Sequence, residues 1–405
     1  MALRGRALLL LFAVANSSAA DASSLAGSLH RFVTENSTVF VGEAPDILTP
    51  FIERLASRGT ALPATSTLPG FTYRFNVELG TFERESGTLG PVFLERGETL
   101  GRSLLALGMS YLDADLGEFD GRNLADQVDF RSDIKSAPRI RTSLVFRELD
   151  VRAQIATLSA TYGVTDRLDA NVLLPLVRTS LDLEARRSGR IGGEPALVDT
   201  VRLHDEAVGV GDLLLRAKYQ LIGGAPLYVA AGLAVRAPTG SEEDFHGLGD
   251  WTVEPALVAS RTLHGHDLHL NLGVECDADD VGRSRGRYGV GVALQPLERV
   301  AVLIDLVGSS SFVGDDLGAT RAGTAGIFSS SRFLARFEAR PRLRQPGGTV
   351  FVFPSVPRTD IVDVAVGFKL TLSARAAAFV SALLPVVNDA LRAEVVPAGG
   401  LEYTF

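Results

Sequence analysis

Residues 362–372 read VDVAVGFKLTL, and apolar side chains occupy nearly every second position. The alternate positions carry Asp363, Gly367 and Lys369. Because successive side chains of an extended chain point to opposite faces, this stretch predicts a β-strand with one apolar and one polar face. Its length of about ten residues is what a tilted strand needs to cross a bilayer.

The same alternation recurs along most of the chain. It is clearest at residues 212–221, 227–237 and 268–276, where apolar side chains face one way and charged or polar ones the other. Weaker versions occupy 104–112, 151–162, 168–183, 251–260, 288–295, 300–308 and 376–386, and a last one ends the chain at 394–405. The total is about twelve segments, an even number, as in single-chain bacterial outer-membrane barrels.

The links between these segments alternate in length. Short links lie at 164–167, 223–226, 263–266, 297–298 and 373–375, and longer ones at 114–150, 185–208, 238–249, 279–286, 312–360 and 387–393. An up-and-down barrel places all short links at one end and all long links at the other. We therefore predict an all-β fold, a transmembrane up-and-down antiparallel β-barrel of about 12 strands, with both chain ends on the periplasmic, short-turn side.

The long links are polar, and we expect solvated loops there, with ligand capture at the barrel mouth as the alternative. The link at 312–360 is the longest of them. A closed barrel that acts as a structural or adhesion element through this loop is therefore a second functional hypothesis.

The amino-terminal region does not resemble barrel wall. Residues 1–20 have a basic start, a short apolar stretch and small residues before Asp21, which predicts a cleaved secretory signal. Residues 21–101 form an N-terminal helical or irregular segment, with a helix expected around 47–55 and a small strand at 71–75. This segment either plugs the lumen, the alternative that we favour, or lies in the periplasm, and residues 102–405 form the barrel.

Composition narrows the class of protein further. No apolar run reaches the length of a transmembrane helix, which argues against a helical membrane protein. The formal net charge of -8 argues against nucleic acid as a partner, since binding to phosphates requires a basic face. Cys276 has no second cysteine for a disulfide, and we expect a buried or lipid-facing thiol.

No arrangement of residues predicts catalysis or a cofactor. His264, His266 and His269 are close in sequence but fall in a turn and on a strand, where neighbouring side chains diverge, so we expect no metal. A lipid-modifying barrel enzyme would need Ser and His side chains together on the outer face at one rim.

The polar faces of the segments supply the candidate site. These side chains are expected to line the lumen, as a channel lining or as ion pairs between neighbouring strands. The candidates are Asp212, Arg216, Lys218, Arg236, Glu254, Glu275, Asp363, Lys369 and Glu402. Both signs of charge occur, so no strong single-sign filter is expected.

The chain ends on an aromatic residue. Leu401, Tyr403 and Phe405 share one face of the last segment, a pattern that resembles the closing strand of bacterial outer-membrane barrels. We expect these side chains to face lipid at the periplasmic rim and to be recognised by the barrel-assembly machinery.

Four stretches resemble a known family. They are residues 90–102, 162–169, 209–219 and 247–255, and the resemblance extends from about Gly70 to Phe405. The outer-membrane family concerned is labelled "putative MetA-pathway of phenol degradation", and its members are commonly called transporters. The resemblance implies a passive channel for small apolar or aromatic solutes, and it assigns no binding residue. We expect the barrel to be a monomer surrounded by outer-membrane lipid.

Overall fold

The computed structural model describes most of the chain. The described residues are 24–36, 66, 73–76, 81–84, 89–119, 122–123, 129–134, 140–191, 194–279, 281–312, 327–328, 344–345, 348–349, 360–388 and 391–405. The expected signal at 1–20 and the expected helix at 47–55 lie outside these residues.

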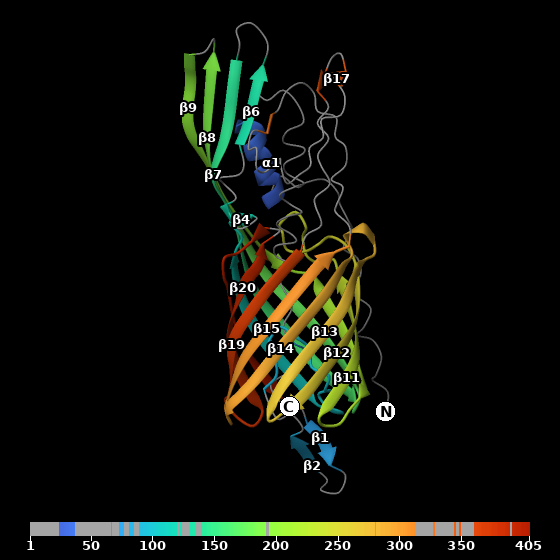
Figure 1. Cartoon of the computed structure of the whole chain (residues 1–405). Coiled ribbons are helices and arrows are strands. Elements are labelled where there is room, and N and C mark those ends of the chain that lie inside the picture. Colours follow the sequence, from blue (N-terminus) through green and yellow to red (C-terminus); the bar gives the residue numbers. More distant parts are fainter. Residues whose placement is uncertain are drawn as a thin grey trace, which may run out of the picture.

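Within them, twelve antiparallel strands close into a barrel (Figure 1). Neighbours in the barrel are neighbours in chain order, and the last strand pairs with the first, with Gly400 opposite Ser110. The strands are β3 (Leu105–Asp115), β7 (Ile140–Thr165), β8 (Leu168–Ile191), β10 (Leu213–Ile222), β11 (Leu227–Ala237), β12 (Thr252–Leu263), β13 (His266–Asp277), β14 (Arg285–Leu297), β15 (Val300–Ser311), β19 (Asp360–Thr371), β20 (Ala376–Asn388) and β22 (Val396–Thr404). Each overlaps one of the segments expected from alternation, so the predicted fold is confirmed.

The two ends of the barrel differ as expected. The short turns gather at the lower end in Figure 1, together with the carboxyl terminus. The longer links, including 238–251, lie at the opposite end. Outer-membrane barrels keep short turns in the periplasm, so the long-loop end faces outward.

The outer wall of the barrel is apolar. Side chains that point outward from the strands are exposed Leu, Val, Ile, Met and Phe, such as Leu107, Met109, Leu215, Leu233, Leu257, Leu270, Val290, Ile304, Phe368, Val380 and Leu401. Exposed aromatic rings lie near both rims, with Tyr162, Tyr219 and Tyr403 near the short turns and Trp251 and Phe312 near the long loops. An apolar band flanked by aromatic rings is what a bilayer-spanning barrel presents to lipid, and the protein is placed in the outer membrane.

Strands β7 and β8 are much longer than a bilayer requires. They contain 26 and 24 residues, whereas about ten suffice for a tilted crossing. Beyond the barrel wall they continue upward and pair with β6 (Asp129–Ile134) and β9 (Glu194–Val210), forming a blade that extends the barrel sheet (Figure 1). Much of the links expected as solvated loops at 114–150 and 185–208 is therefore strand, and that expectation was wrong.

The polar composition of this blade has a structural reason. Charged side chains face each other directly across β8 and β9, with Arg187 2.6 Å from Asp199 and Arg202 2.7 Å from Glu184. Opposite charges at cross-strand positions stabilise a sheet, so a charged sequence need not be a loop. The His204 imidazole lies 2.5 Å from Asp182, and this hydrogen bond raises the pKa of His204 above its ordinary value.

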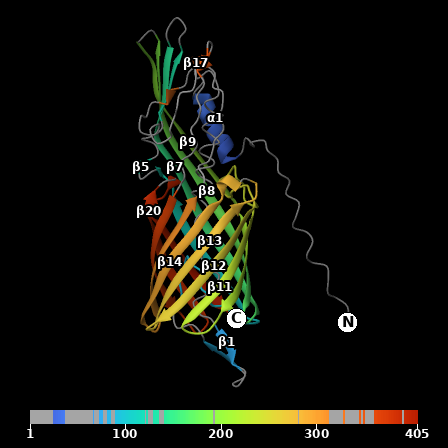
Figure 2. The same ribbon diagram turned by 45° about the vertical axis from the view of Figure 1, so that its right-hand side comes forward.

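The amino-terminal helix α1 (Leu25–Asn36) covers the face of the blade that carries Leu183 and Arg187, and Arg187 donates a hydrogen bond to Asn36 at 3.4 Å. Leu25, Leu29 and Phe32 recur at helical spacing, are buried, and belong to the same apolar cluster as Leu183. The Ser24 hydroxyl accepts a hydrogen bond from Gly27 N at 3.0 Å and caps the helix. Figures 1 and 2 show α1 beyond the long-loop end, a position that neither the lumen nor the periplasm alternative included.

The remaining elements are short. The hairpin of β1 (Tyr73–Asn76) and β2 (Thr81–Arg84) lies beyond the short-turn end, and its first strand overlaps the one expected at 71–75 (Figure 2). The others are β4 (Glu118–Phe119), β5 (Arg122–Asn123), η2 (Val281–Arg283), β16 (Ile327–Phe328), β17 (Arg344–Gln345), β18 (Gly348–Thr349) and β21 (Leu391–Arg392).

Candidate functional site

Residues 89–101 run through the inside of the barrel and are almost entirely buried. We call this stretch the lumenal segment. Its main chain is held by carboxylates of the wall: Asp305 of β15 accepts hydrogen bonds from Val92 N and Phe93 N at 3.3 and 3.4 Å. Asp169 of β8 accepts one from Leu100 N at 2.9 Å. These bonds satisfy backbone donors that would otherwise be buried without a partner.

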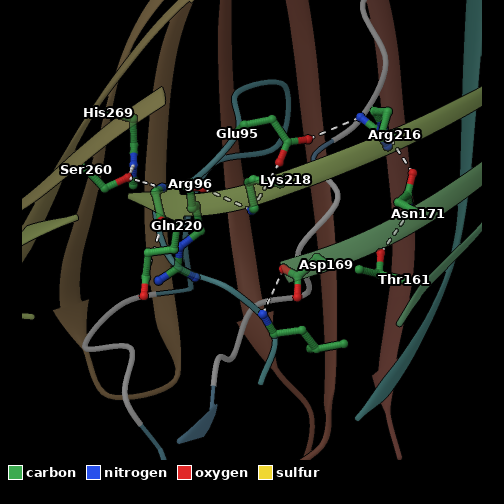
Figure 3. A network of polar contacts seen from close by, with 12 residues as sticks. Glu95, Arg96, Thr161, Asp169, Asn171, Arg216, Lys218, Gln220, Ser260 and His269 are labelled. Atoms are coloured by element: carbon green, nitrogen blue, oxygen red, sulfur yellow. Dashed lines mark hydrogen bonds and ion pairs between the residues drawn. The ribbon is translucent and has the colours of Figure 1, made fainter. Parts of the chain in front are cut away.

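Strand β10 holds the middle of the lumenal segment (Figure 3). Arg216 Nη1 lies 3.1 Å from Glu95 Oε1, and Lys218 Nζ lies 3.5 Å from Glu95 Oε2. Lys218 also donates to the Arg96 carbonyl at 3.0 Å, and Gln220 donates to the Gly97 carbonyl at 3.4 Å. Side chains on one face of β10 therefore bind three successive residues of the lumenal segment, Glu95, Arg96 and Gly97.

Strand β12, two strands from β10 in the sheet, adds further contacts. Gly97 N donates to Ser260 Oγ at 2.9 Å, and Ser260 is in turn hydrogen-bonded to His269 Nδ1 at 2.9 Å. Arg96 and Glu98 form a buried ion pair at 3.3 Å. Because it also contacts Asp169 of β8 and Asp305 of β15, the lumenal segment touches polar groups on both sides of the barrel.

Glycines of the wall make room for an apolar side chain of the lumenal segment. Leu94 lies against Gly289 and Gly291 of β14, where a Cβ atom on either glycine would collide with its methyl groups. Since inward-facing positions on β14 have no side chain here, Leu94 fills the space and packs into the wall.

A cavity of about 190 Å³ lies between the lumenal segment and the long-loop end of the barrel. Phe93, Leu94 and Glu95 border it on the segment side. The wall contributes a polar side from β10 to β14 and apolar groups such as Val258, Val307 and Ile361. This mixture of apolar surface and a few placed polar groups is typical of a small-molecule site.

The polar side of the cavity is a ladder of ion pairs. Glu275 of β13 lies 2.8 Å from Arg287 and 3.2 Å from Arg285, both on β14. Glu254 of β12 lies 3.7 Å from Arg287. Nearer the long-loop end, Arg392 is hydrogen-bonded to Asp363 of β19.

The structure places the sequence candidates in two groups. Those that line the cavity are Arg216, Lys218, Arg236, Glu254, Glu275 and Asp363. The others lie outside the cavity lining. Asp212 accepts hydrogen bonds from Gly240 N at 3.1 Å and Leu248 N at 2.9 Å and so fixes the 238–251 link. Lys369 and Glu402 pair at 2.9 Å.

Four charged residues of the cavity were not among the candidates: Glu95, Arg285, Arg287 and Arg392. For Arg285 and Arg287 a signal existed, because alternation continues backward from the strand expected at 288–295 and places both on the polar face. No local pattern indicates Glu95 or Arg392, which lie outside the barrel strands.

The described residues contain no group of three or more His, Cys, Asp or Glu side chains arranged to hold a metal ion. Of the three clustered histidines, His269 is buried against Ser260, whereas His264 lies in the turn between β12 and β13. Cys276 is exposed on the outer wall, in line with the exposed Val274. No described helix is long and apolar enough to cross a bilayer.

Comparisons with known proteins found solved structures that are similar to the chain at low sequence identity. No curated protein matches the chain in sequence. An outer membrane channel from Pseudomonas putida F1 is similar in structure, with 13% identity, a TM-score of 0.43, and coverage of 76% of this chain and 97% of that one. A FadL homologue of Pseudomonas aeruginosa is similar with 10% identity and a TM-score of 0.33, and the match covers 87% of this chain and 96% of that one. The CymD monoaromatic hydrocarbon channel is similar with 12% identity and a TM-score of 0.34, and the match covers 75% of this chain and 89% of that one.

A family model matches residues 142–292, which extend from β7 into β14. This range contains three of the four stretches that suggested the resemblance, although it is shorter than the expected span from about Gly70 to Phe405. Over these residues the chain carries the sequence pattern of the family described as "Putative MetA-pathway of phenol degradation", on a twelve-stranded barrel of the outer membrane.

Proposed function

We propose that the protein is a passive outer-membrane channel for small apolar or aromatic solutes. The observation that carries this proposal is the cavity inside the closed barrel, bordered by the lumenal segment on one side and reaching the strand ends at the long-loop end. Its apolar groups, among them Phe93, Val307 and Ile361, suit a solute with an apolar body. The description of the matching family, which names phenol degradation, is consistent with such a solute.

The proposal is tested by solute entry into proteoliposomes. We expect phenyl β-glucoside, a neutral aromatic solute that bilayers pass slowly, to enter proteoliposomes faster than protein-free liposomes, as measured by osmotic swelling. Raffinose, which is larger and lacks an aromatic ring, serves as the control and should enter more slowly. Swelling at the protein-free rate in both solutes would remove the proposal.

We propose no catalytic role. A lipid-modifying barrel enzyme would need its Ser and His on the outer face at a rim, whereas Ser260 and His269 meet on the inner face and are both buried. The adhesion alternative rests on residues 312–360, most of which lie outside the described residues.

We further propose that the chain works as a monomer and reaches the membrane through the barrel-assembly machinery, which would recognise the closing strand. Leu401, Tyr403 and Phe405 are all exposed on the outer wall at the short-turn end. The rings of Tyr403 and Phe405 lie 4.7 Å apart in an edge-to-face arrangement. They form one apolar aromatic surface that an assembly factor can contact before the barrel closes.

Phe405→Ala is expected to lower the amount of assembled barrel, because it removes the terminal ring of this surface. The measurement is the fraction of protein in outer membranes that shows the altered gel migration of a folded barrel when left unheated. Phe312→Ala is the matched control, since Phe312 is equally exposed, 55% against 56%, but lies near the opposite rim. Equal amounts of assembled barrel in both variants would count against a role for Phe405.

A further inference from the structure

The cavity carries more positive than negative charge. Among the described residues that line it, six are basic and four are acidic, an excess of two. Charges inside a membrane barrel are costly unless they are paired, so an excess of one sign marks a place where an ion of the other sign can bind.

Arg236 of β11 contributes positive charge to the cavity that no other side chain neutralises by direct pairing in the described part of the chain. Within the described part of the chain no hydrogen bond or ion pair joins its guanidinium to another group, and its Nε is buried without an acceptor. It faces Thr252 across the sheet, and its charge acts on Asp212, Glu275 and Arg216 without direct pairing.

The carboxylates near Arg236 are already engaged. Glu275 pairs with Arg285 and Arg287, and Asp212 accepts hydrogen bonds from two backbone N–H groups of the 238–251 link. Glu95, on the lumenal segment, pairs with Arg216 and Lys218. Glu254 of β12 pairs with Arg287 at 3.7 Å. Among the described residues no carboxylate therefore pairs directly with Arg236, and a bound anion can take that position.

The remainder of the lining is apolar or small. Phe93 and Leu94 border the cavity from the lumenal segment, and Ala234, Ala256 and Val258 contribute from β11 and β12. A planar guanidinium binds a carboxylate through two parallel hydrogen bonds, and an apolar surface nearby can take up a ring or a short chain.

We infer that the cavity binds a small aromatic or apolar solute that carries one carboxylate, with Arg236 as the residue that binds the carboxylate. This inference rests on the proposed function and names the solute class more closely. The anionic group distinguishes this class from neutral phenols or hydrocarbons, for which an unpaired arginine in the lumen would be a disadvantage.

The test is equilibrium binding to the full chain in detergent, measured by isothermal titration calorimetry. Benzoate is the probe, and benzamide is its neutral control of nearly the same shape. We expect benzoate to bind about tenfold more tightly than benzamide, because a hydrogen bond to a charged group contributes more than a neutral one.

Substitutions of Arg236 test whether this residue causes the preference for benzoate over benzamide. Arg236→Gln should weaken benzoate binding about tenfold and leave benzamide unchanged, and Arg236→Lys should retain part of the preference. Arg178→Gln is the matched control, since it removes an equal charge from an exposed pair with Glu206 on the blade. Altered migration of unheated protein on a gel shows that each variant is folded.

The inference is overturned if benzoate and benzamide bind equally, if neither binds, or if Arg236→Gln leaves benzoate binding unchanged. Binding is measured without a membrane, so it is independent of solute passage. A barrel that binds benzoate through Arg236 but passes no solute would refute the channel and keep the site.

Discussion

Replacing Val92–Glu98 with a Gly/Ser linker of the same length is expected to raise the single-channel conductance of the barrel several-fold. These residues hold the lumenal segment against β10, β12 and β15 through hydrogen bonds and ion pairs. A barrel of twelve strands is wider than its wall side chains alone can fill, so releasing the segment leaves a continuous aqueous path.

The measurement is ion conductance in planar bilayers, with the wild-type barrel as reference. A Gly/Ser replacement of residues 203–209 is the control, because it alters a stretch of β9 of equal length that lies in the blade outside the barrel wall. Its conductance should stay at the wild-type level. Unchanged conductance in the Val92–Glu98 replacement would show that this stretch does not limit the lumen.

Glu402→Gln is expected to destabilise the barrel by roughly 3–5 kcal/mol, the typical cost of leaving one partner of a buried ion pair alone. Lys369 on β19 is completely buried, and its ammonium lies 2.9 Å from Glu402 on β22, the closing strand. Without the Glu402 carboxylate, Lys369 depends on Asp305, whose Oδ2 already accepts two hydrogen bonds from the lumenal segment.

The free energy of unfolding can be followed in urea with the barrel in lipid vesicles, using fluorescence of Trp251, the only tryptophan. Asp113→Asn is the control, since it breaks the Arg152 pair at 2.6 Å, in which the arginine is 52% exposed. Exposed pairs contribute about 0–1 kcal/mol, so this variant should stay near wild type. A loss below about 1 kcal/mol in Glu402→Gln would mean that water reaches and solvates Lys369.

A second comparison distinguishes the cost of an unpaired buried charge from the cost of lost side-chain packing. Lys369→Met should cost less than Glu402→Gln, because Glu402 is 14% exposed and can be hydrated when left alone, whereas Lys369 cannot. If the two variants lose equal stability, the cost lies in side-chain packing rather than in an unpaired buried charge.

The barrel strands could be predicted almost completely because their signal is local. Alternation with a period of two follows from backbone geometry, and it distinguishes outward Leu233 from inward Arg236 without knowledge of any neighbour. The blade could not be predicted in this way. Its strands carry charges such as Arg187 and Asp199 that become sheet-stabilising only after pairing across β8 and β9.

In the candidate site, the sequence predicted which side chains face the lumen, but it did not predict which residues they pair with. The alternating pattern put Arg216 and Lys218 on the polar face, but it gave no indication that both bind Glu95, which lies 121 residues from Arg216 in the sequence. Helix α1 was missed for a related reason: Leu25, Leu29 and Phe32 form only a short amphipathic pattern, and it is their burial against the blade that stabilises the helix.

By itself the sequence determined an outer-membrane barrel of twelve strands, the side of each strand that meets lipid, and the end that carries the long links. These properties depend on residues close together in the chain, whose alternation is set by the geometry of an extended backbone. Only the tertiary structure decided that residues 89–101 occupy the lumen, that β7 and β8 rise beyond the membrane, and that Arg236 is left without a partner in the described chain. Closing the barrel brings distant residues into contact, and their pairing depends on that closure.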